Sequence, residues 1–84
     1  MKKIIIDIRE SYEYKMGHLP NAINIPKDIL ELVPENYLNK NNYYVIYCDK
    51  GIASAKLSKE LNQKGYNTKS LNGGYEEWSK KNKI

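Results

Sequence analysis

The sequence is poor in cysteine, since its 84 residues contain only Cys48. One cysteine cannot form an internal disulfide or a cysteine-based metal cluster. Small domains that are stabilised by disulfides or by cysteine-bound metals are therefore excluded. Nothing in this cysteine usage indicates an oxidising compartment. The chemistry of the single thiol therefore has to be judged from its neighbours in the chain.

A long apolar run is also missing, because no stretch approaches the roughly 20 apolar residues of a membrane-spanning helix. The start of the chain, where Lys2-Lys3 precedes Ile4-Ile5-Ile6, briefly resembles a secretory signal. Asp7 ends that run too early for a signal peptide, and no small-residue cleavage site follows. We therefore expect a cytoplasmic protein that makes no use of a membrane.

Charge of one sign is not concentrated anywhere, although the net charge is +4 and the sequence pI is 9.1. Acidic residues stand among the lysines, as in Lys27-Asp28 and Lys59-Glu60. The one dense basic run belongs to a segment, Lys80 to Ile84, that we expect to be a frayed tail. We expect no nucleic-acid partner, and expect the positive charge to attract a small anion or an acidic partner protein.

What is present fits one small globular domain spanning residues 1–84. The apolar fraction of 40% and the mixed charge argue against disorder. A domain of this size buries only about 60–65% of its unfolded surface, so its core must be compact. No internal repeat, linker or low-complexity segment divides the chain, and a monomer is the default expectation.

Strand and helix patterns alternate along the chain. Strands are predicted at 4–7, 22–25, 43–47 and 68–71, and helical segments at 11–15, 29–33, from 52 to about 64, and after the turn at 72–74. The segment 43–47 is the strongest strand, because its residues are all aromatic or β-branched and show no polar alternation. We expect Gly17 to end the first helical turn in a left-handed conformation, and Lys64-Gly65 to close the long helix.

The strand at 43–47, the helix after Gly51 and the strand at 68–71 form a strand–helix–strand crossover. Such a crossover implies parallel strands joined by a right-handed connection. We therefore predict an α/β fold in which helices cover both faces of a mainly parallel sheet.

Cys48 lies at the carboxyl end of the strongest strand, which is where ligands bind in open parallel sheets. The short loop into the next helix can surround the thiol with backbone N–H groups, and Gly51 supplies the conformational freedom that this needs. Such a nest favours the nucleophilic thiolate. A buried structural cysteine is the alternative, but polar residues follow Cys48 directly. The candidate catalytic residue is Cys48, and the candidate substrate-binding groups are the N–H groups of Asp49, Lys50, Gly51, Ile52, Ala53 and Ser54, with the Lys50 side chain.

Two ordered blocks of residues carry a resemblance to a known family. They are Asp7-x-Arg9 with Glu13-Tyr14-x-x-Gly17-His18-Leu19-Pro20-x-Ala22-x-Asn24-Ile25-Pro26, and Cys48-x-x-Gly51-x-x-Ser54-Ala55 with Gly65-Tyr66 and Asn72-Gly73-Gly74-x-x-x-Trp78. Their order and spacing, from about Asp7 to Trp78, are similar to the rhodanese family. The resemblance implies a rhodanese-like three-layer α/β/α fold with a central, mainly parallel sheet.

The resemblance also implies a sulfurtransferase activity. In that reaction Cys48 takes a sulfane sulfur from thiosulfate or a persulfide and holds it as a persulfide. It then passes the sulfur to cyanide, a thiol or a partner protein, in two steps that predict ping-pong kinetics. No metal or organic cofactor is implied, because the reaction needs only the thiol.

The loop departs from the family pattern in its charges. Many active members carry arginines just after the cysteine and just before the serine, where this chain has Asp49 and Ala53. Lys50 is the only cation left in the loop, and an aspartate beside the thiolate opposes anion binding. We therefore expect a protein-bound persulfide or a neutral donor to suit the loop better than the thiosulfate dianion.

Two further functions remain open from the sequence. A cysteine phosphatase or arsenate reductase needs an arginine six positions after the cysteine, where this chain has Ser54, so that chemistry is the weaker alternative. A binding or regulatory module would keep the fold without turnover, and a sulfur carrier that works only with a protein partner lies between these functions.

Several other residues invite a functional interpretation. His18, the only histidine, is interpreted as part of a structural turn and not as a general base for Cys48. Arg9 and Glu13 are spaced for an ion pair if Arg9 is already helical, but we prefer that both, with Asp7, hold the first loop in place.

The glycines and aromatic residues near the site are treated in the same way. Asn72-Gly73-Gly74 is interpreted as a turn and helix cap and not as a phosphate loop. Tyr75 and Trp78 are assigned to the core because they are three residues apart on one helix. Tyr47, directly before Cys48, is a candidate for the mouth of the pocket.

Overall fold

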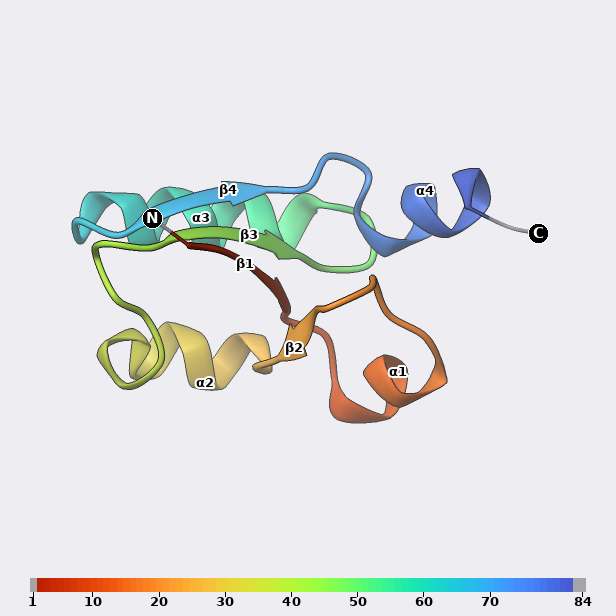
Figure 1. The fold of residues 1–84 in the computed structure, drawn as a ribbon, viewed down its shortest axis with the longest axis horizontal. Helices are drawn as coiled ribbons and strands as arrows, with labels where there is room; N and C mark the ends of the chain where they lie inside the picture. The colour runs from red at the N-terminus through yellow and green to blue at the C-terminus, as the bar shows by residue number, and fades with distance from the viewer. Residues whose placement is uncertain (1, 83–84) are drawn as a thin grey trace.

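The computed structural model describes residues 2–82, which form one four-stranded sheet flanked by helices (Figure 1). The strands are β1 (Lys3–Asp7), β2 (Ile23–Asn24), β3 (Tyr43–Tyr47) and β4 (Asn67–Ser70), and the helices are α1 (Ser11–Met16), α2 (Lys27–Leu32), the 3-10 turn η1 (Pro34–Asn36), α3 (Ile52–Gln63) and α4 (Gly74–Lys81). No helix in the described part of the chain is long and apolar enough to cross a membrane.

All neighbouring strands are parallel, in the order β2-β1-β3-β4. β3 is an inner strand, with Ile6 of β1 opposite Ile46 and Asp7 opposite Tyr47. The crossover from β3 through α3 to β4 is the one that the sequence predicts. The fold is therefore α/β, as expected from the alternation of strand and helix patterns.

Two hydrophobic cores lie on opposite faces of the sheet, because side chains alternate along each strand. The first, toward α2 and α3, is built from Ile6, Ile8, Ile25, Leu30, Leu38, Tyr44, Ile46, Leu57 and Leu61. In the second, Tyr14 of α1 and Tyr75 and Trp78 of α4 pack against buried Leu19, Ala22 and Tyr47. The assignment of Tyr75 and Trp78 to the core is thereby confirmed.

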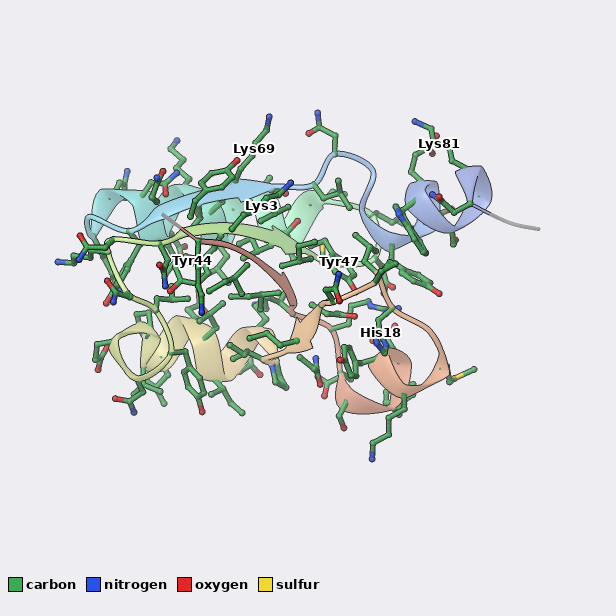
Figure 2. The ribbon with its side chains drawn as sticks, viewed as in Figure 1. Lys3, His18, Tyr44, Tyr47, Lys69 and Lys81 are labelled. Atoms are coloured by element: carbon green, nitrogen blue, oxygen red, sulfur yellow. The ribbon has the colours of Figure 1, made fainter. Side chains whose placement is uncertain are left out.

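The second face of the sheet is covered only in part. Figure 1 shows α1 and α4 at the end to which the strand arrows point. Tyr43 and Val45, nearer the start of β3, are therefore only half-buried, although the lack of polar alternation suggested a strand covered on both faces. Lys3 and Lys69 are exposed beside them and extend away from the sheet (Figure 2).

The conformation predicted for Gly17 is wrong. Its φ of 162° is extended backbone, which any residue can adopt. Glycine is favoured there for space, because a Cβ would lie 2.5 Å from the Tyr75 hydroxyl. Gly65, which closes α3, does adopt a positive φ of 96°.

The segment expected to be a frayed tail begins inside a helix. Lys80 and Lys81 belong to α4, and the backbone N–H of Asn82 donates to the Trp78 carbonyl at 3.0 Å. Lysines in the last turn suit the negative end of a helix, and Lys80 also pairs with Glu76 at 3.7 Å. Lys83 and Ile84, the rest of that predicted tail, lie outside the described residues.

Candidate active site

Cys48 directly follows β3, and the chain turns from it into α3 within a few residues. Gly51 makes this turn with a φ of 94°, a left-handed conformation that disfavours other residues. Space is also limited, since a Cβ on Gly51 would lie 3.0 Å from the backbone nitrogen of Gly73. The glycine in this loop is thus required by both conformation and packing.

Hydrogen-bond donors of the loop converge on the sulfur of Cys48. The backbone N–H groups of Gly51 and Ser54 donate to Sγ at 3.2 and 3.3 Å, and the Ser54 hydroxyl lies 3.4 Å from it. Burial by itself raises the pKa of Cys48, but the hydrogen bonds from Ser54, Gly51 and Lys50 outweigh it and lower the pKa. This arrangement favours the thiolate more than in a free cysteine.

The other predicted loop residues are arranged differently. Asp49, Lys50 and Ile52 are exposed, so their side chains line the opening of the loop and not its centre. Within residues 2–82, no hydrogen bond engages the N–H groups of Ile52 and Ala53. These two groups, at the positive end of α3, remain available to an anionic ligand.

The start of α4 holds the cysteine loop from outside. The N–H groups of Tyr75 and Glu76 donate to the carbonyls of Cys48 and Asp49 at 2.8 and 2.9 Å. Gly74 permits this approach, because a Cβ on it would lie 2.6 Å from the Asp49 carbonyl oxygen. The turn-and-cap interpretation of the two glycines is confirmed, but their contact with the cysteine loop is not visible in the sequence.

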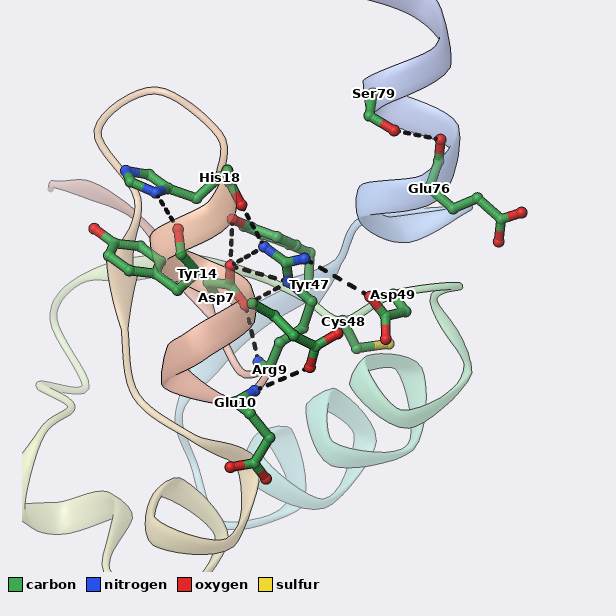
Figure 3. A network of polar contacts seen from close by, with 12 residues as sticks. Asp7, Arg9, Glu10, Tyr14, His18, Tyr47, Cys48, Asp49, Glu76 and Ser79 are labelled. Carbon is green, nitrogen blue, oxygen red and sulfur yellow. Dashed lines mark hydrogen bonds and ion pairs between the residues drawn. The ribbon is translucent and has the colours of Figure 1, made fainter.

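A buried polar network behind the site joins β1, β3 and the first loop (Figure 3). Asp7 is fully buried and accepts hydrogen bonds from Arg9 Nη2 at 2.7 Å and from the Tyr47 hydroxyl at 2.8 Å. Arg9 also donates to the Gly17 carbonyl at 2.7 Å, and the Leu19 N–H donates to the Tyr47 hydroxyl. Burial raises the pKa of Tyr47, which keeps its hydroxyl a donor. Asp7 and Arg9 thus hold the first loop in place, which is the role that we preferred for them on the basis of the sequence.

Two further possibilities that the sequence left open for this region are not realised. Arg9 and Glu13 do not pair, because Arg9 precedes α1, and a carboxylate oxygen of Glu13 instead accepts the N–H of Glu10 at 3.3 Å. Tyr47 does not line the pocket mouth, since it is fully buried between the sheet and the first loop.

Arg9 extends from this network toward the cysteine loop. Figure 3 shows its guanidinium between Asp7 and Asp49, and Nη1 lies 3.7 Å from the Asp49 carboxylate. Its Cζ atom also lies 4.0 Å from the centre of the Tyr75 ring. The charge of Arg9 is therefore already engaged, mainly by buried Asp7.

A pocket of about 260 Å³ opens beside Cys48. Its lining is Ile8, Arg9, Glu10, Glu13, Lys27, Asp28, Cys48, Asp49 and Ala53. Four carboxylates in this lining face only two cations, and Lys27 itself lies within 4.0 Å of Asp28 and Glu31. The approach to the thiol is therefore acidic, although the whole chain is basic. A larger hollow of about 550 Å³ lies over α3 and β4 and does not include Cys48.

His18 takes no part in this pocket. Its ring stacks on Tyr14 with 3.8 Å between ring centres, and Nδ1 lies 2.8 Å from the Tyr14 carbonyl. The structural interpretation of His18 agrees with these contacts. In the described part of the chain, no three acidic, histidine or cysteine side chains are grouped so as to hold a metal ion.

Comparison with known proteins gives one family. The family described as rhodanese-like domain matches residues 1–81. A tRNA sulfurtransferase of Desulfurococcus amylolyticus is 42% identical over 84% of this chain and 14% of its own length. A tRNA uridine(34) hydroxylase of Photorhabdus laumondii is 36% identical over 93% of this chain and 24% of its own length. The chain thus spans about a quarter or less of the length of these curated relatives.

Solved structures show the same similarity. A rhodanese-related protein from Thermoplasma volcanium superposes with a TM-score of 0.86 at 30% identity, over 95% of this chain and 79% of that one. A rhodanese-like domain protein from Staphylococcus aureus gives a TM-score of 0.75 at 33% identity, over 93% of this chain and 91% of that one. Both matches extend over nearly the whole of the present chain.

Proposed function

The chain belongs to the rhodanese-like domain family, and on this premise we propose that it is a sulfurtransferase that carries sulfur on Cys48. The observation that supports this most directly is the set of donors around the sulfur. Gly51 and Ser54 both donate backbone N–H groups to Sγ, and the pKa of Cys48 is lowered. A thiolate at the mouth of a pocket is the form that attacks sulfur.

The reaction takes place in two displacements. In the first, the Cys48 thiolate attacks the sulfane sulfur of the donor, a new S–S bond forms on Sγ, and the donor's bond to that sulfur breaks. The electron pair of the broken bond leaves with the rest of the donor, as sulfite or as a thiolate. In the second, a thiolate or cyanide attacks the outer sulfur of the persulfide and releases the Cys48 thiolate. No external oxidant or reductant is needed.

The loop offers further groups to the persulfide intermediate. The outer sulfur of the persulfide carries the negative charge, and charge-assisted hydrogen bonds stabilise such an atom. The N–H groups of Ile52 and Ala53 make no hydrogen bond within residues 2–82 and lie at the N-terminus of α3. We assign them the role of holding the outer sulfur.

The acidic lining of the pocket supports a particular class of donor. Asp49, Glu10 and Glu13 would repel the thiosulfate dianion, and the charge of Arg9 is engaged by Asp7. We infer that the donor is a persulfide, on a small molecule or on a protein, whose carrier group is neutral or positive. Persulfides are called neutral or anionic by the charge of that carrier group. The acidic partner expected from the net charge of the chain does not suit this pocket.

The names of the relatives raise the question of nucleic acid. Two of them are named for tRNA, but the chain spans about a quarter or less of each. The absence of a nucleic-acid partner stays a prediction for this chain. The carboxylates around Cys48 support it for this face, because they would repel phosphates.

A sulfur carrier that depends on a protein partner is the second candidate. Ile52 favours it, because this apolar side chain is 78% exposed while it lines a hollow shared with Cys48. An exposed apolar residue next to a reactive group is typical of a contact surface.

The experiment compares donors by intact mass. Reduced protein is incubated with thiosulfate or with a neutral low-molecular-weight persulfide, and its mass is read before and after cyanide is added. We expect Cys48 to gain one sulfur from the persulfide, to lose it to cyanide, and to gain none after Cys48→Ser. No gain from either donor, with a thiol that alkylates slowly at neutral pH, would refute turnover and leave the carrier function to be tested with a partner.

A further inference from the structure

Two pairs of hydroxyl groups connect α3 with β4. Ser54 and Ser70 place their oxygens 2.6 Å apart, and Ser58 and Thr68 do the same at 2.6 Å. The pairs repeat because residues four apart on a helix and two apart on a strand share a face. Only the first pair reaches the active site, through the 3.4 Å contact between Ser54 Oγ and Cys48 Sγ.

The Ser54 hydroxyl has one hydrogen and is fully buried. When Cys48 is a thiol, its S–H donates to Ser54 Oγ, and the Ser54 hydrogen is then free to donate to Ser70. When the sulfur is ionised it can only accept, so Ser54 donates to the sulfur and Ser70 donates to Ser54. Both charge states are satisfied because a serine at position 70 can both accept and donate.

We propose that Ser70 is a positioning residue for Cys48, which directs the Ser54 hydrogen to the ionised sulfur and so stabilises the thiolate. This role rests on the proposed function of Cys48 in sulfur transfer. Hydrogen bonds in a chain polarise one another, so a donor to Ser54 strengthens the bond that Ser54 makes to the sulfur. Ser70 is only half-buried, so its hydroxyl can turn in either direction without being left unsatisfied.

Other charged groups near the thiol do not take part in this chain. Those that line the hollows at Cys48 are Arg9, Lys27, Glu10, Glu13, Asp28, Asp49 and Lys50. Within the residues that the structure describes, no hydrogen bond or ion pair joins any of these side chains to Ser54 or Ser70. A change at Ser70 therefore leaves the charges around the sulfur as they are.

The test is a matched pair of variants at one position. Ser70→Thr keeps the hydroxyl. Ser70→Val introduces a side chain of the same shape as threonine but without the hydroxyl, and both residues suit a strand. The thiol pKa is read from the pH dependence of the alkylation rate, which requires no sulfur transfer. We expect Ser70→Val to raise the thiol pKa and to lower the alkylation rate at neutral pH about twofold, and Ser70→Thr to behave as the parent protein.

Ser58→Ala is the control, because it removes the second hydroxyl pair without touching the sulfur. We expect it to leave the alkylation profile unchanged. The proposal is overturned if Ser70→Val and Ser58→Ala have the same profile, or if Ser70→Thr shifts the profile as far as Ser70→Val does. Failure of the proposed function looks different, since the parent protein would then gain no sulfur from either donor, whatever the alkylation profiles of the Ser70 and Ser58 variants.

Discussion

Cys48 owes its reactivity to competition between burial and hydrogen bonding. Burial opposes the thiolate, whereas the hydroxyl of Ser54 and the N–H groups of Ser54 and Gly51 favour it. A hydrogen bond to a charged group contributes about 1.5–3 kcal/mol, and one pKa unit corresponds to about 1.4 kcal/mol. Loss of one such donor is therefore enough to move the pKa of this thiol measurably.

The first prediction concerns the pH dependence of this thiol. Only the thiolate reacts, so the alkylation rate should rise through the pKa of Cys48 and level off above it, with its midpoint below that of free cysteine. Ser54→Ala removes the side-chain donor and should move the midpoint up by about one pH unit. An iodoacetamide rate profile measures both. An unchanged midpoint in Ser54→Ala would show that the backbone donors alone set the pKa.

The second prediction concerns the missing loop arginines. Ala53→Arg places a cation in the lining of the Cys48 pocket and should raise kcat/KM for thiosulfate about tenfold at low salt, because thiosulfate carries two negative charges. The rate with a neutral persulfide should change little. Ala55→Arg is the matched control, since Ala55 is exposed on the same helix and does not line that pocket. Equal gains in both variants would contradict a local effect.

The cysteine loop is held between two helices. α3 supplies the Ser54 N–H to the sulfur, and α4 supplies the N–H groups of Tyr75 and Glu76 to the carbonyls of Cys48 and Asp49. Hydrogen-bond donors thus reach the loop from its inner side and from its outer side, and the N-termini of α3 and α4 together fix its shape. Gly74, with a φ of 59°, makes the outer contact possible, because a Cβ there would meet the Cys48 and Asp49 carbonyls.

The third prediction tests the contact between the start of α4 and the cysteine loop, which we call the α4 clamp. Gly74→Ala introduces a Cβ that must displace the Cys48 and Asp49 carbonyls, so it should cost more than about 2 kcal/mol of unfolding free energy and also slow alkylation of Cys48. Gly65→Ala is the control, because Gly65 also has a positive φ but lies against the flexible end of Lys40. It should cost about 1–2 kcal/mol and leave the thiol unchanged. Urea unfolding and alkylation rates measure the two effects, and a similar thiol rate in both variants would contradict the clamp.

Charge is distributed unevenly over the molecule. The whole chain carries +4, with exposed lysines such as Lys3 and Lys69 at the uncovered part of the sheet. The pocket at Cys48 is lined instead by more carboxylates than cations. A substrate that reaches the thiol meets the local charge at short range, where salt screens it least.

The fourth prediction uses salt to distinguish the effect of the acidic pocket from that of the net positive charge of the chain. If the pocket dominates, the rate with an anionic persulfide should rise about two- to threefold from about 0.01 M to about 0.5 M salt, because screening weakens the repulsion. A neutral persulfide, the control, should show little change. A rate with the anionic persulfide that falls as salt increases would show that the net positive charge of the chain governs approach, and would contradict the inferred donor class.

Local sequence patterns were enough to locate the helices and strands and to place the thiol at the end of β3. The aromatic and β-branched run at 43–47 indicated an inner strand, and the strand–helix–strand order from 43 to 71 indicated a parallel crossover. Cys48 at the carboxyl end and Gly51 in the turn follow from these local signals. They were predictable because periodicity and turn chemistry are properties of neighbouring residues.

The surroundings of the thiol, in contrast, depend on contacts between residues far apart in the chain. Ser70 reaches Ser54 across 16 positions, and Tyr47 reaches Asp7 across 40, so neither contact leaves a local pattern. The burial of Tyr47, the clamp by α4 and the acidic lining of the pocket arise in the same way, from segments that the sheet brings together. Local patterns fix which element a residue belongs to, whereas its contacts depend on how distant elements pack.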